Sequence, residues 1–332
     1  MGLDYQPRFS LSEGGTDVTS KLEPYLASLS LSDNAGTESD RLAIELASDK
    51  IPTPLAGAVL RLGLGFGLAL VDKGQFVVDE VSVSGPPRVI SITASASPMD
   101  SRKQAGVLQS QKTRSWDTTT VGGMVEHIAG DHGLMPRISD DLASISIDHL
   151  DQVNESDMSV LTRLAKRFGA VAKPAGGFLL FIKEGEGKSA SGKELKQIDL
   201  VPAQVSSYQF RFASRGKIGS VVASYTDVVS GQPTNITIGS GAPVFNIVYP
   251  YPNRDEAAKA AEARFNQVRS DADSVSLNLP ATPNIMALVA EGKVNLSGFG
   301  DREDGQWRVK TLRWSLNGSG LQLSINGDRL GS

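Results

Sequence analysis

The sequence predicts a mainly β fold with an α+β insert, in which two related β modules flank a small αβ domain. Three observations support this prediction: a pattern that occurs near both ends of the chain, short apolar runs separated by turn residues, and a change to helical periodicity in the middle. Glycine accounts for 34 of the 332 residues and aromatic residues for only 6%, which is typical of many short strands joined by turns. A chain of this length is expected to hold about two or three domains.

The repeated pattern occupies residues 74–84 and 305–315. The two segments share Gly, Gln, Val and Ser at matching places, and Phe76 corresponds to Trp307. Each segment follows a Gly-Phe-Gly sequence, at 65–67 and 298–300. Upstream of each, apolar residues alternate in the same way: Leu42, Ile44 and Leu46 in the first copy, and Val275, Leu277 and Leu279 in the second. Amphipathic strands can resemble each other by chance, and for the upstream pair alone that alternative is as good as a duplication.

A change of parity inside both segments favours the duplication. The apolar residues Phe76 and Val78 are followed by Val81, and Trp307 and Val309 are followed by Leu312. Since strand side chains alternate between two faces, such a change requires an extra residue or a bend. We therefore expect a β-bulge or corner at the same place in both copies, a device that helps sheets to close into barrels. Residues 39–97 and 273–326 are predicted to superpose strand for strand.

The first β region extends from residue 9 to about residue 98. Glycine, proline, asparagine and aspartate separate its predicted strands. These strands lie at 29–31, 41–47, 59–71, 75–84 and 89–96. About six strands fit in this span, which suits a small barrel or sandwich.

The middle of the chain has helical periodicity. A helix is predicted after Thr120, which can cap it, with an end at Gly133, and a second helix after Ser156 with an end at Gly169. A strand is expected around Ile145, and a hairpin pairs 170–173 with 178–182. This αβαββ unit is interpreted as a separate domain inserted between the two copies of the repeat.

The remaining segments complete the second β region. Residues 184–196 contain almost no apolar side chain and are predicted to form a mobile loop. Strands are expected at 208–212 and 220–225, and Asn253 with Glu256 predicts a capping box for a helix over 254–269. The predicted domains are 1–104 and 206–332 for the two β modules and 105–205 for the α+β insert, with the helix as an insertion in the second module.

Several motifs that resemble cofactor sites do not fit their patterns. Gly187-Lys188-Ser189 resembles the end of a phosphate-binding loop, but Ile182 stands where that motif requires glycine. Gly63, Gly65 and Gly67 have the wrong spacing for a dinucleotide fingerprint, and glycines in this arrangement suit a strand that packs closely against another backbone. We predict no cofactor.

The candidates for catalytic or metal-binding residues are histidines and carboxylates. His127 and His132 are five residues apart on a helix and point to different faces, and sequence assigns no partner to His149. The other candidates are loop carboxylates: Asp140, Asp141, Asp148 and Asp151. A paired acid–base site stays open as an alternative, but no pocket motif supports it. With no cysteine in the chain, thiolate chemistry and disulfides are excluded, and we predict no catalytic or metal site.

Charge and targeting signals exclude further classes of protein. The formal net charge is -4, so no basic field indicates sequence-specific nucleic-acid binding. The first residues lack the apolar core of a signal peptide, and the longest apolar stretch, 58–71, is too short to span a bilayer and contains Arg61. We expect a soluble protein that does not insert into membranes by itself.

The chain resembles the late control protein D family of phages, the central hub of contractile tails. It is also similar in plan to the N-terminal hub region of the type VI secretion spike protein VgrG. Four segments carry the resemblance: Tyr5 to Phe9, Ser39 to Leu42 together with Asp79 to Val81, Val153 to Asp157 before Leu161 to Ala165, and Gly305 to Trp307. Together they span essentially the whole chain.

The resemblance implies a homotrimeric ring in which each subunit supplies two β-barrels of the tail-tube type. It further implies a non-enzymatic hub that joins a sixfold tail tube to a threefold central spike, in contact with other baseplate and tape-measure components. Such a protein is made in the bacterial cytoplasm and resides in an assembled phage tail or tail-like bacteriocin. The alternative is a baseplate protein that binds or hydrolyses peptidoglycan, with the αβ insert as its active module.

Overall fold

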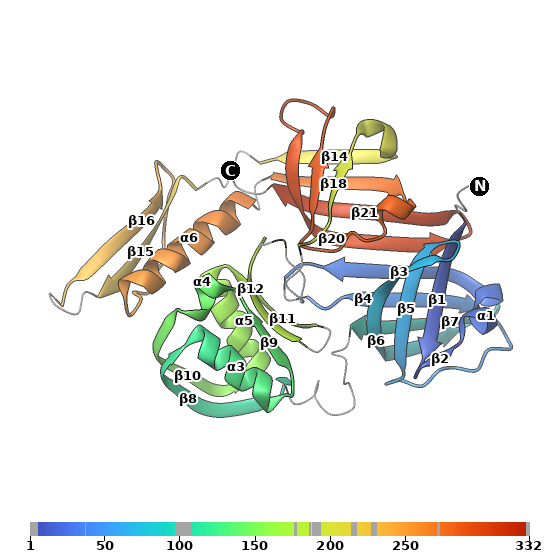
Figure 1. The fold of residues 1–332 in the computed structure, drawn as a ribbon, viewed down its shortest axis with the longest axis horizontal. Helices are drawn as coiled ribbons and strands as arrows, with labels where there is room; N and C mark the ends of the chain where they lie inside the picture. Colours follow the sequence, from blue (N-terminus) through green and yellow to red (C-terminus); the bar gives the residue numbers. More distant parts are fainter. Residues whose placement is uncertain are drawn as a thin grey trace. The chain divides into compact units, whose positions relative to one another are not determined.

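The computed structural model describes residues 6–36, 38–96, 108–175, 178–185, 187, 194–213, 218–226, 231–270 and 273–329. The fold is mainly β with an α+β portion, as predicted (Figure 1). Contacts divide the chain into two compact units. The first unit comprises Met1–Ser101, Glu194–Gln209 and Val275–Gly327, and the second comprises Arg102–Lys193, Phe210–Ser274 and Asp328–Ser332.

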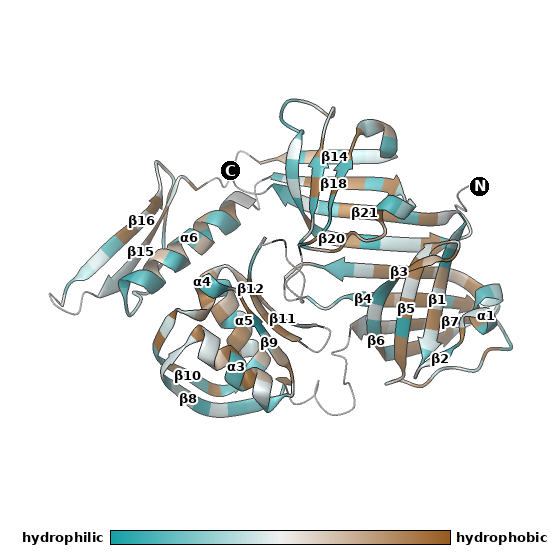
Figure 2. Cartoon of the chain, in the orientation of Figure 1, coloured by the Kyte–Doolittle hydropathy of each residue, from teal (hydrophilic) through white to brown (hydrophobic). Residues whose placement is uncertain are grey.

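A 13-stranded sheet forms the first unit, and one end of three of its strands (residues 210–212, 273–274 and 328–329) belongs to the second unit. Its strands are β1 (Pro7–Glu13), β2 (Thr16–Asp17), β3 (Leu26–Asn34), β4 (Arg41–Ala47), β5 (Val59–Phe66), β6 (Ala69–Ser84), β7 (Val89–Ala96), β13 (Gln197–Leu200), β14 (Ser207–Phe212), β18 (Asp273–Pro280), β19 (Lys293–Leu296), β20 (Gly305–Asn317) and β21 (Gly320–Arg329). Short helical turns lie at α1 (Thr19–Leu22), η1 (Glu23–Tyr25), η2 (Pro202–Gln204) and η3 (Pro283–Ile285). Along these strands brown and teal residues alternate in Figure 2, as expected for strands with one buried face.

The two predicted copies have the same strand order. In the first copy the order is β4-β7-β6-β5, and in the second it is β18-β21-β20-β19. Each order is extended at one end by a strand from outside the repeat, β3 next to β4 and β14 next to β18. At the other end β1 lies antiparallel to β5, whereas β13 lies parallel to β19. The shared order agrees with the duplication that the sequence predicts.

The change of parity in the first copy is a β-bulge. The pairing of β6 with β7 shifts register between Val78 and Glu80, which makes Asp79 the extra residue. In the second copy the buried residues of β20 change parity at the corresponding place, from Trp307 and Val309 to Leu312.

The apolar run at 59–71 was expected as one strand but forms two. Gly67 and Leu68 make a two-residue turn between β5 and β6, with Gly67 at a φ of 54° and Leu68 fully exposed. Gly65 is tightly packed at this hairpin, since a Cβ atom there would lie 2.0 Å from the carbonyl oxygen of Ala69. This close approach to backbone is the role predicted for the glycines of this segment.

The second unit contains the predicted α+β insert. Its elements are β8 (Gln111–Thr120), α3 (Val121–Asp131), β9 (Met135–Ile138), α4 (Asp140–Ala143), β10 (Ser146–Ser156), α5 (Asp157–Phe168), β11 (Ala170–Ala175) and β12 (Phe178–Lys183). Both predicted caps are confirmed, because the side chain of Thr120 accepts a hydrogen bond from the backbone of Gly123 and that of Ser156 from Ser159. The predicted hairpin forms as β11 and β12, and β10 pairs with β8, a strand that sequence analysis missed.

The same unit holds another three-stranded sheet, which we expected in the second β module. It consists of β15 (Ser220–Thr226), β16 (Pro233–Gly239) and β17 (Val244–Asn246), and helix α6 (Arg254–Ser270) packs against it. The cause is the apolar stripe of α6, in which Ala257 and Ala261 are buried in one cluster with Val221 and Ala223. The division into three sequence ranges stays a prediction, but strand pairing refines it: α6 belongs with β15 to β17, and β13 pairs with β19 of the second copy. Most of the loop expected at 184–196 lies outside the described residues.

Candidate functional site

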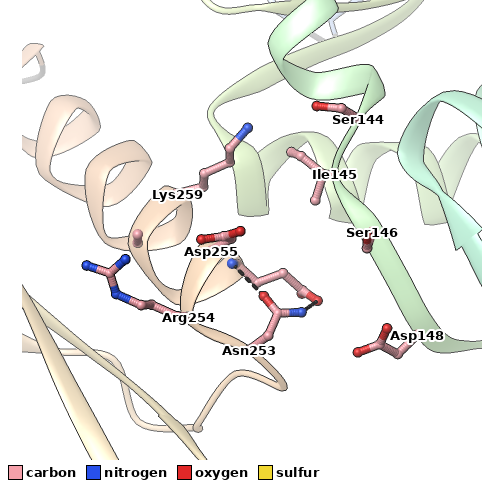
Figure 3. A pocket seen from close by; sticks show the side chains of 10 residues that line it. Ser144, Ile145, Ser146, Asp148, Asn253, Arg254, Asp255 and Lys259 are labelled. Atoms are coloured by element: carbon pink, nitrogen blue, oxygen red, sulfur yellow. Dashed lines mark hydrogen bonds between the residues drawn. The ribbon is translucent and has the colours of Figure 1, made fainter. Parts of the chain in front are cut away.

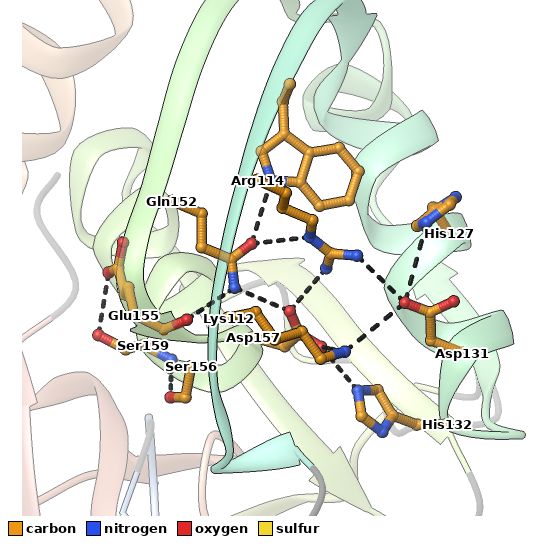
Figure 4. Close-up of polar contacts among 11 residues, drawn as sticks. Lys112, Arg114, His127, Asp131, His132, Gln152, Glu155, Ser156, Asp157 and Ser159 are labelled. Atoms are coloured by element: carbon orange, nitrogen blue, oxygen red, sulfur yellow. Dashed lines mark hydrogen bonds and ion pairs between the residues drawn. The ribbon is translucent and has the colours of Figure 1, made fainter.

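A fully buried carboxylate, Asp157, is the centre of the main polar cluster in the α+β insert (Figure 4). Lys112 Nζ lies 2.6 Å from its Oδ2, and Arg114 Nη2 lies 2.6 Å from its Oδ1. Gln152 Nε2 donates to Oδ1 at 2.9 Å, and His132 Nε2 lies 2.8 Å from Oδ2. The partners come from β8, from β10 and from the residue that follows α3. Asp157 itself is the first residue of α5, where a negative charge is favourable toward the helix dipole.

The partners of Asp157 keep it ionised. Burial alone would raise the pKa of this carboxyl, but hydrogen bonds from Gln152, Lys112 and His132 and the charge of Arg114 outweigh burial and lower the pKa to about 2. A carboxylate with four donors around it holds strands and helices together. It is not poised to exchange protons near neutral pH.

Arg114 extends the cluster toward the surface. Its guanidinium also contacts Gln152 Oε1 at 2.9 Å and Asp131 Oδ2 at 3.1 Å, and it lies 4.2 Å from the centre of the Trp116 ring. The indole of Trp116 donates to the same Gln152 oxygen at 3.2 Å. One face of β8 carries Lys112, Arg114 and Trp116, which are every second residue of the strand. This period-two pattern of basic and aromatic residues is the signal that could have predicted the site.

The three histidines have different surroundings. His132 is buried beside Asp157, whereas His127 is exposed and its Nε2 lies 3.8 Å from Asp131. His149 sits between Asp117 and Asp151 on the exposed face of β8 and β10, and hydrogen bonds first to Asp117 and then to Asp151 raise the pKa of its imidazole. In the part of the chain that the structure describes, no three histidine or carboxylate side chains come together in a group that could hold a metal ion.

A pocket of about 570 Å³ lies between the start of β10 and the first turn of α6 (Figure 3). Ser144, Ser146 and Asp148 line one side, and Arg254, Asp255 and Lys259 line the other. Asp148, one of the candidate carboxylates of the sequence, therefore lies on a pocket wall together with charged residues of α6. Of the other loop carboxylates, Asp140 and Asp141 form the first turn of α4, and Asp151 contacts Ser115 and His149.

The floor of this pocket is the predicted helix cap. Asn253 Oδ1 accepts from the backbone of Glu256 at 2.9 Å, as in a capping box, but the second bond runs from Asn253 Nδ2 to the Glu256 carboxylate at 3.1 Å instead of from the Asn253 backbone. Glu256 is buried and forms an ion pair with Arg167 of α5. Burial raises its pKa, against the opposing effects of Arg167 and Asn253. These contacts attach α6 to α5, so the charges here have a structural role.

The sheet of the first unit has its own polar contact between the two copies. Lys73 of β6 donates to the carbonyl oxygen of Met286 at 2.7 Å, and its ammonium lies 4.3 Å from the centre of the Trp314 ring on β20. Burial lowers the pKa of Lys73 to about 8, against the opposing charge of Asp33. Lys73 thus joins residues that lie more than 200 positions apart in the sequence.

The comparison with known proteins identifies the family. The family model of the phage tail baseplate hub, GPD, matches residues 105–319, well over half of the chain. The chain belongs to this family. It is 32% identical to the probable baseplate hub protein of Escherichia phage 186, over 98% of this chain and 93% of the relative.

Solved structures share the fold of this hub protein. The 43 kDa tail protein of prophage MuSo2 from Shewanella oneidensis superposes with a TM-score of 0.72 at 14% identity, over 97% of this chain and 98% of the other. A type VI secretion system component from E. coli superposes with a TM-score of 0.58 at 11% identity, over 96% of this chain and 76% of the other. The resemblance to phage hubs and to the type VI secretion proteins is therefore confirmed. No helix among the described segments has the length and apolar character needed to cross a membrane.

Proposed function

We propose that this baseplate hub protein is a non-enzymatic adaptor, three copies of which form a ring between a sixfold tail tube and a threefold central spike. The observation that carries the proposal is the strand order shared by the two copies of the repeat. A closed ring of identical chains has cyclic symmetry, and two related modules per chain give a trimer six related modules. One face of the ring can then meet a sixfold tube while the ring keeps threefold symmetry for the spike.

The partners in this proposal are the central spike, the tail tube and the other baseplate and tape-measure components of a contractile tail. The hub is made in the bacterial cytoplasm and incorporated into the baseplate of a phage tail or tail-like bacteriocin. The similarity to a hub protein of phage 186 and the tail-protein fold support this assignment.

Native mass spectrometry of the protein together with its spike tests the stoichiometry. We expect three hub chains for each spike trimer. Six copies of the hub in one particle, or a stable dimer, would contradict the adaptor mechanism. The bare protein is expected to be monomeric until the spike is present.

The competing hypothesis of a peptidoglycan-active protein rests on the pocket beside Asp148. Incubation of the purified protein with peptidoglycan separates the two hypotheses, and we expect no release of fragments. Reproducible release that is lost in Asp148→Asn or in His149→Ala would overturn the non-enzymatic assignment. Release that survives both substitutions would indicate a contaminating hydrolase.

A further inference from the structure

The duplication provides one junction between modules inside the chain. β3, next to the first copy, pairs antiparallel with Thr311–Asn317 of β20 in the second copy, in the register Trp314 opposite Leu31. The equivalent of this half of β20 is residues 80–84 of β6, and the equivalent of β3 is β14. β14 is the terminal strand of the described sheet, and beyond Val78 the β5 side of β6 has no partner strand among the described residues.

The two edges without a partner strand among the described residues expose side chains whose counterparts are buried at the internal junction. Trp314 and Leu29 are 0% and 1% exposed at the junction. Their counterparts, Val83 on β6 and Tyr208 on β14, are 49% and 52% exposed. Apolar side chains on an edge strand favour pairing with another strand.

We propose that the second half of β6 in one subunit pairs antiparallel with β14 of a neighbouring copy of this chain. The proposal rests on the trimeric hub proposed above and describes how its subunits join. The two edges differ, so each subunit offers one to the neighbour on one side and the other to the neighbour on the opposite side. Such head-to-tail contacts generate a ring when the rotation closes. Internal junctions and subunit junctions then alternate around the six modules.

Equivalent contacts in the two copies set the register of this junction. Ser28 Oγ of β3 donates to Glu45 at 2.9 Å, and Ser207 Oγ of β14 accepts from Asn278 Nδ2 at 3.0 Å. Glu45 and Asn278 occupy the same place in β4 and β18, because each lies between the last two residues of the alternating apolar triplet. Ser28 therefore corresponds to Ser207.

With Ser28 matched to Ser207 and Trp314 matched to Val83, each residue pair of the internal junction has a counterpart at the subunit junction. Trp314 opposite Leu31 becomes Val83 opposite Phe210, and Arg313 opposite Ser32 becomes Ser82 opposite Arg211. Glu80, two residues before Ser82, lies diagonally across from Arg211 in this register. Opposite charges at such positions stabilise an antiparallel pair.

Cysteine cross-linking tests the junction directly, since the chain has no cysteine of its own. Residues directly opposite in an antiparallel pair have Cα atoms about 4.5–5.5 Å apart, within the reach of a disulfide. We expect the double variant Ser82→Cys with Arg211→Cys, in assembled tail particles under oxidising conditions, to give covalent trimers on a non-reducing gel. The matched control is Ser91→Cys with Arg211→Cys. Ser91 is the partner of Ser82 on β7 and lies one strand further from the junction, about 10 Å from Arg211 and out of reach.

Two outcomes would overturn the proposal in distinguishable ways. If native mass spectrometry finds trimers and the Ser82–Arg211 pair does not cross-link, the subunits join elsewhere and the trimeric hub stands. If neither trimers nor cross-links form, both proposals fail.

Val83→Asp provides an independent measurement: we expect at least about tenfold weaker trimer association, with monomer stability unchanged because Val83 is half exposed in the monomer. Unchanged association in this variant would contradict the proposed junction.

Discussion

The two copies of the repeat differ less in how they fold than in what lies beside them. Both have the order of four strands described above, and both place an aromatic side chain in the core at the same position, Phe76 in one and Trp307 in the other. Beyond the bulge they diverge, because this half of β20 has β3 as a neighbour, whereas the corresponding half of β6 has no partner strand on that side among the described residues. A duplicated module therefore keeps its interior while the residues at its edges are selected by what each edge will contact.

The largest expected effects test the part that the copies share. Phe76→Ala and Trp307→Ala should each lower the free energy of unfolding by about 3–5 kcal/mol, since both side chains are at most 1% exposed. Urea unfolding followed by circular dichroism measures both. The two positions would not be equivalent if one substitution proved nearly neutral.

Trp314 and Val83 test the part in which the copies differ. Trp314→Ala should cost about 3 kcal/mol or more, while Val83→Ala should cost less than about 0.5 kcal/mol in the isolated chain. The reason is that Trp314 is fully buried beside β3 and Val83 is half exposed. Equal losses in denaturant titrations would show that β6 is already covered in the monomer.

The insert, which has no counterpart in the repeat, should respond to acid through Asp157. Its folded pKa of about 2 lies below its ordinary value, so the stability that it contributes is present above about pH 4 and is lost as the pH falls toward 2. We expect a contribution of about 2 kcal/mol at neutral pH. Asp157→Asn should remove this acid dependence, and the fluorescence of Trp116, which contacts Arg114 and Gln152, reports on it locally. The same acid profile in Asp157→Asn would assign the sensitivity to another carboxylate.

A smaller effect than that of Asp157 is expected for Lys73, which contacts both copies. Its folded pKa of about 8 is lower than its ordinary value of 10.5, so the folded chain binds fewer protons than the unfolded chain between these values and stability rises with pH across that window. Lys73→Met should flatten this rise, which we expect to be on the order of 1 kcal/mol. Urea unfolding midpoints at about pH 7.5 and about pH 9.5 measure this rise in stability. A rise that persists in Lys73→Met would exclude this lysine as its source.

Local patterns in the sequence were sufficient for much of this fold. Parity and spacing located the repeat, the bulge and the caps at Thr120 and Ser156, because each depends on residues close together in the chain. The packing partner of α6 could not be predicted for the opposite reason, since its stripe of small residues fits many partners and only its contacts with β15 select one. The cluster around Asp157 was also missed, because its members lie up to 45 residues apart and become neighbours only when β8 pairs with β10.

The seven residue pairs that join β3 to β20 also determine how the first unit would bear mechanical load. Tension along the strands would stress these backbone hydrogen bonds together, so that the modules part only when all of the bonds break at once. Tension across the strands would break the bonds one after another, from one end. We therefore expect the unit to resist shear far better than peeling, a difference that single-molecule pulling from two choices of attachment points can measure.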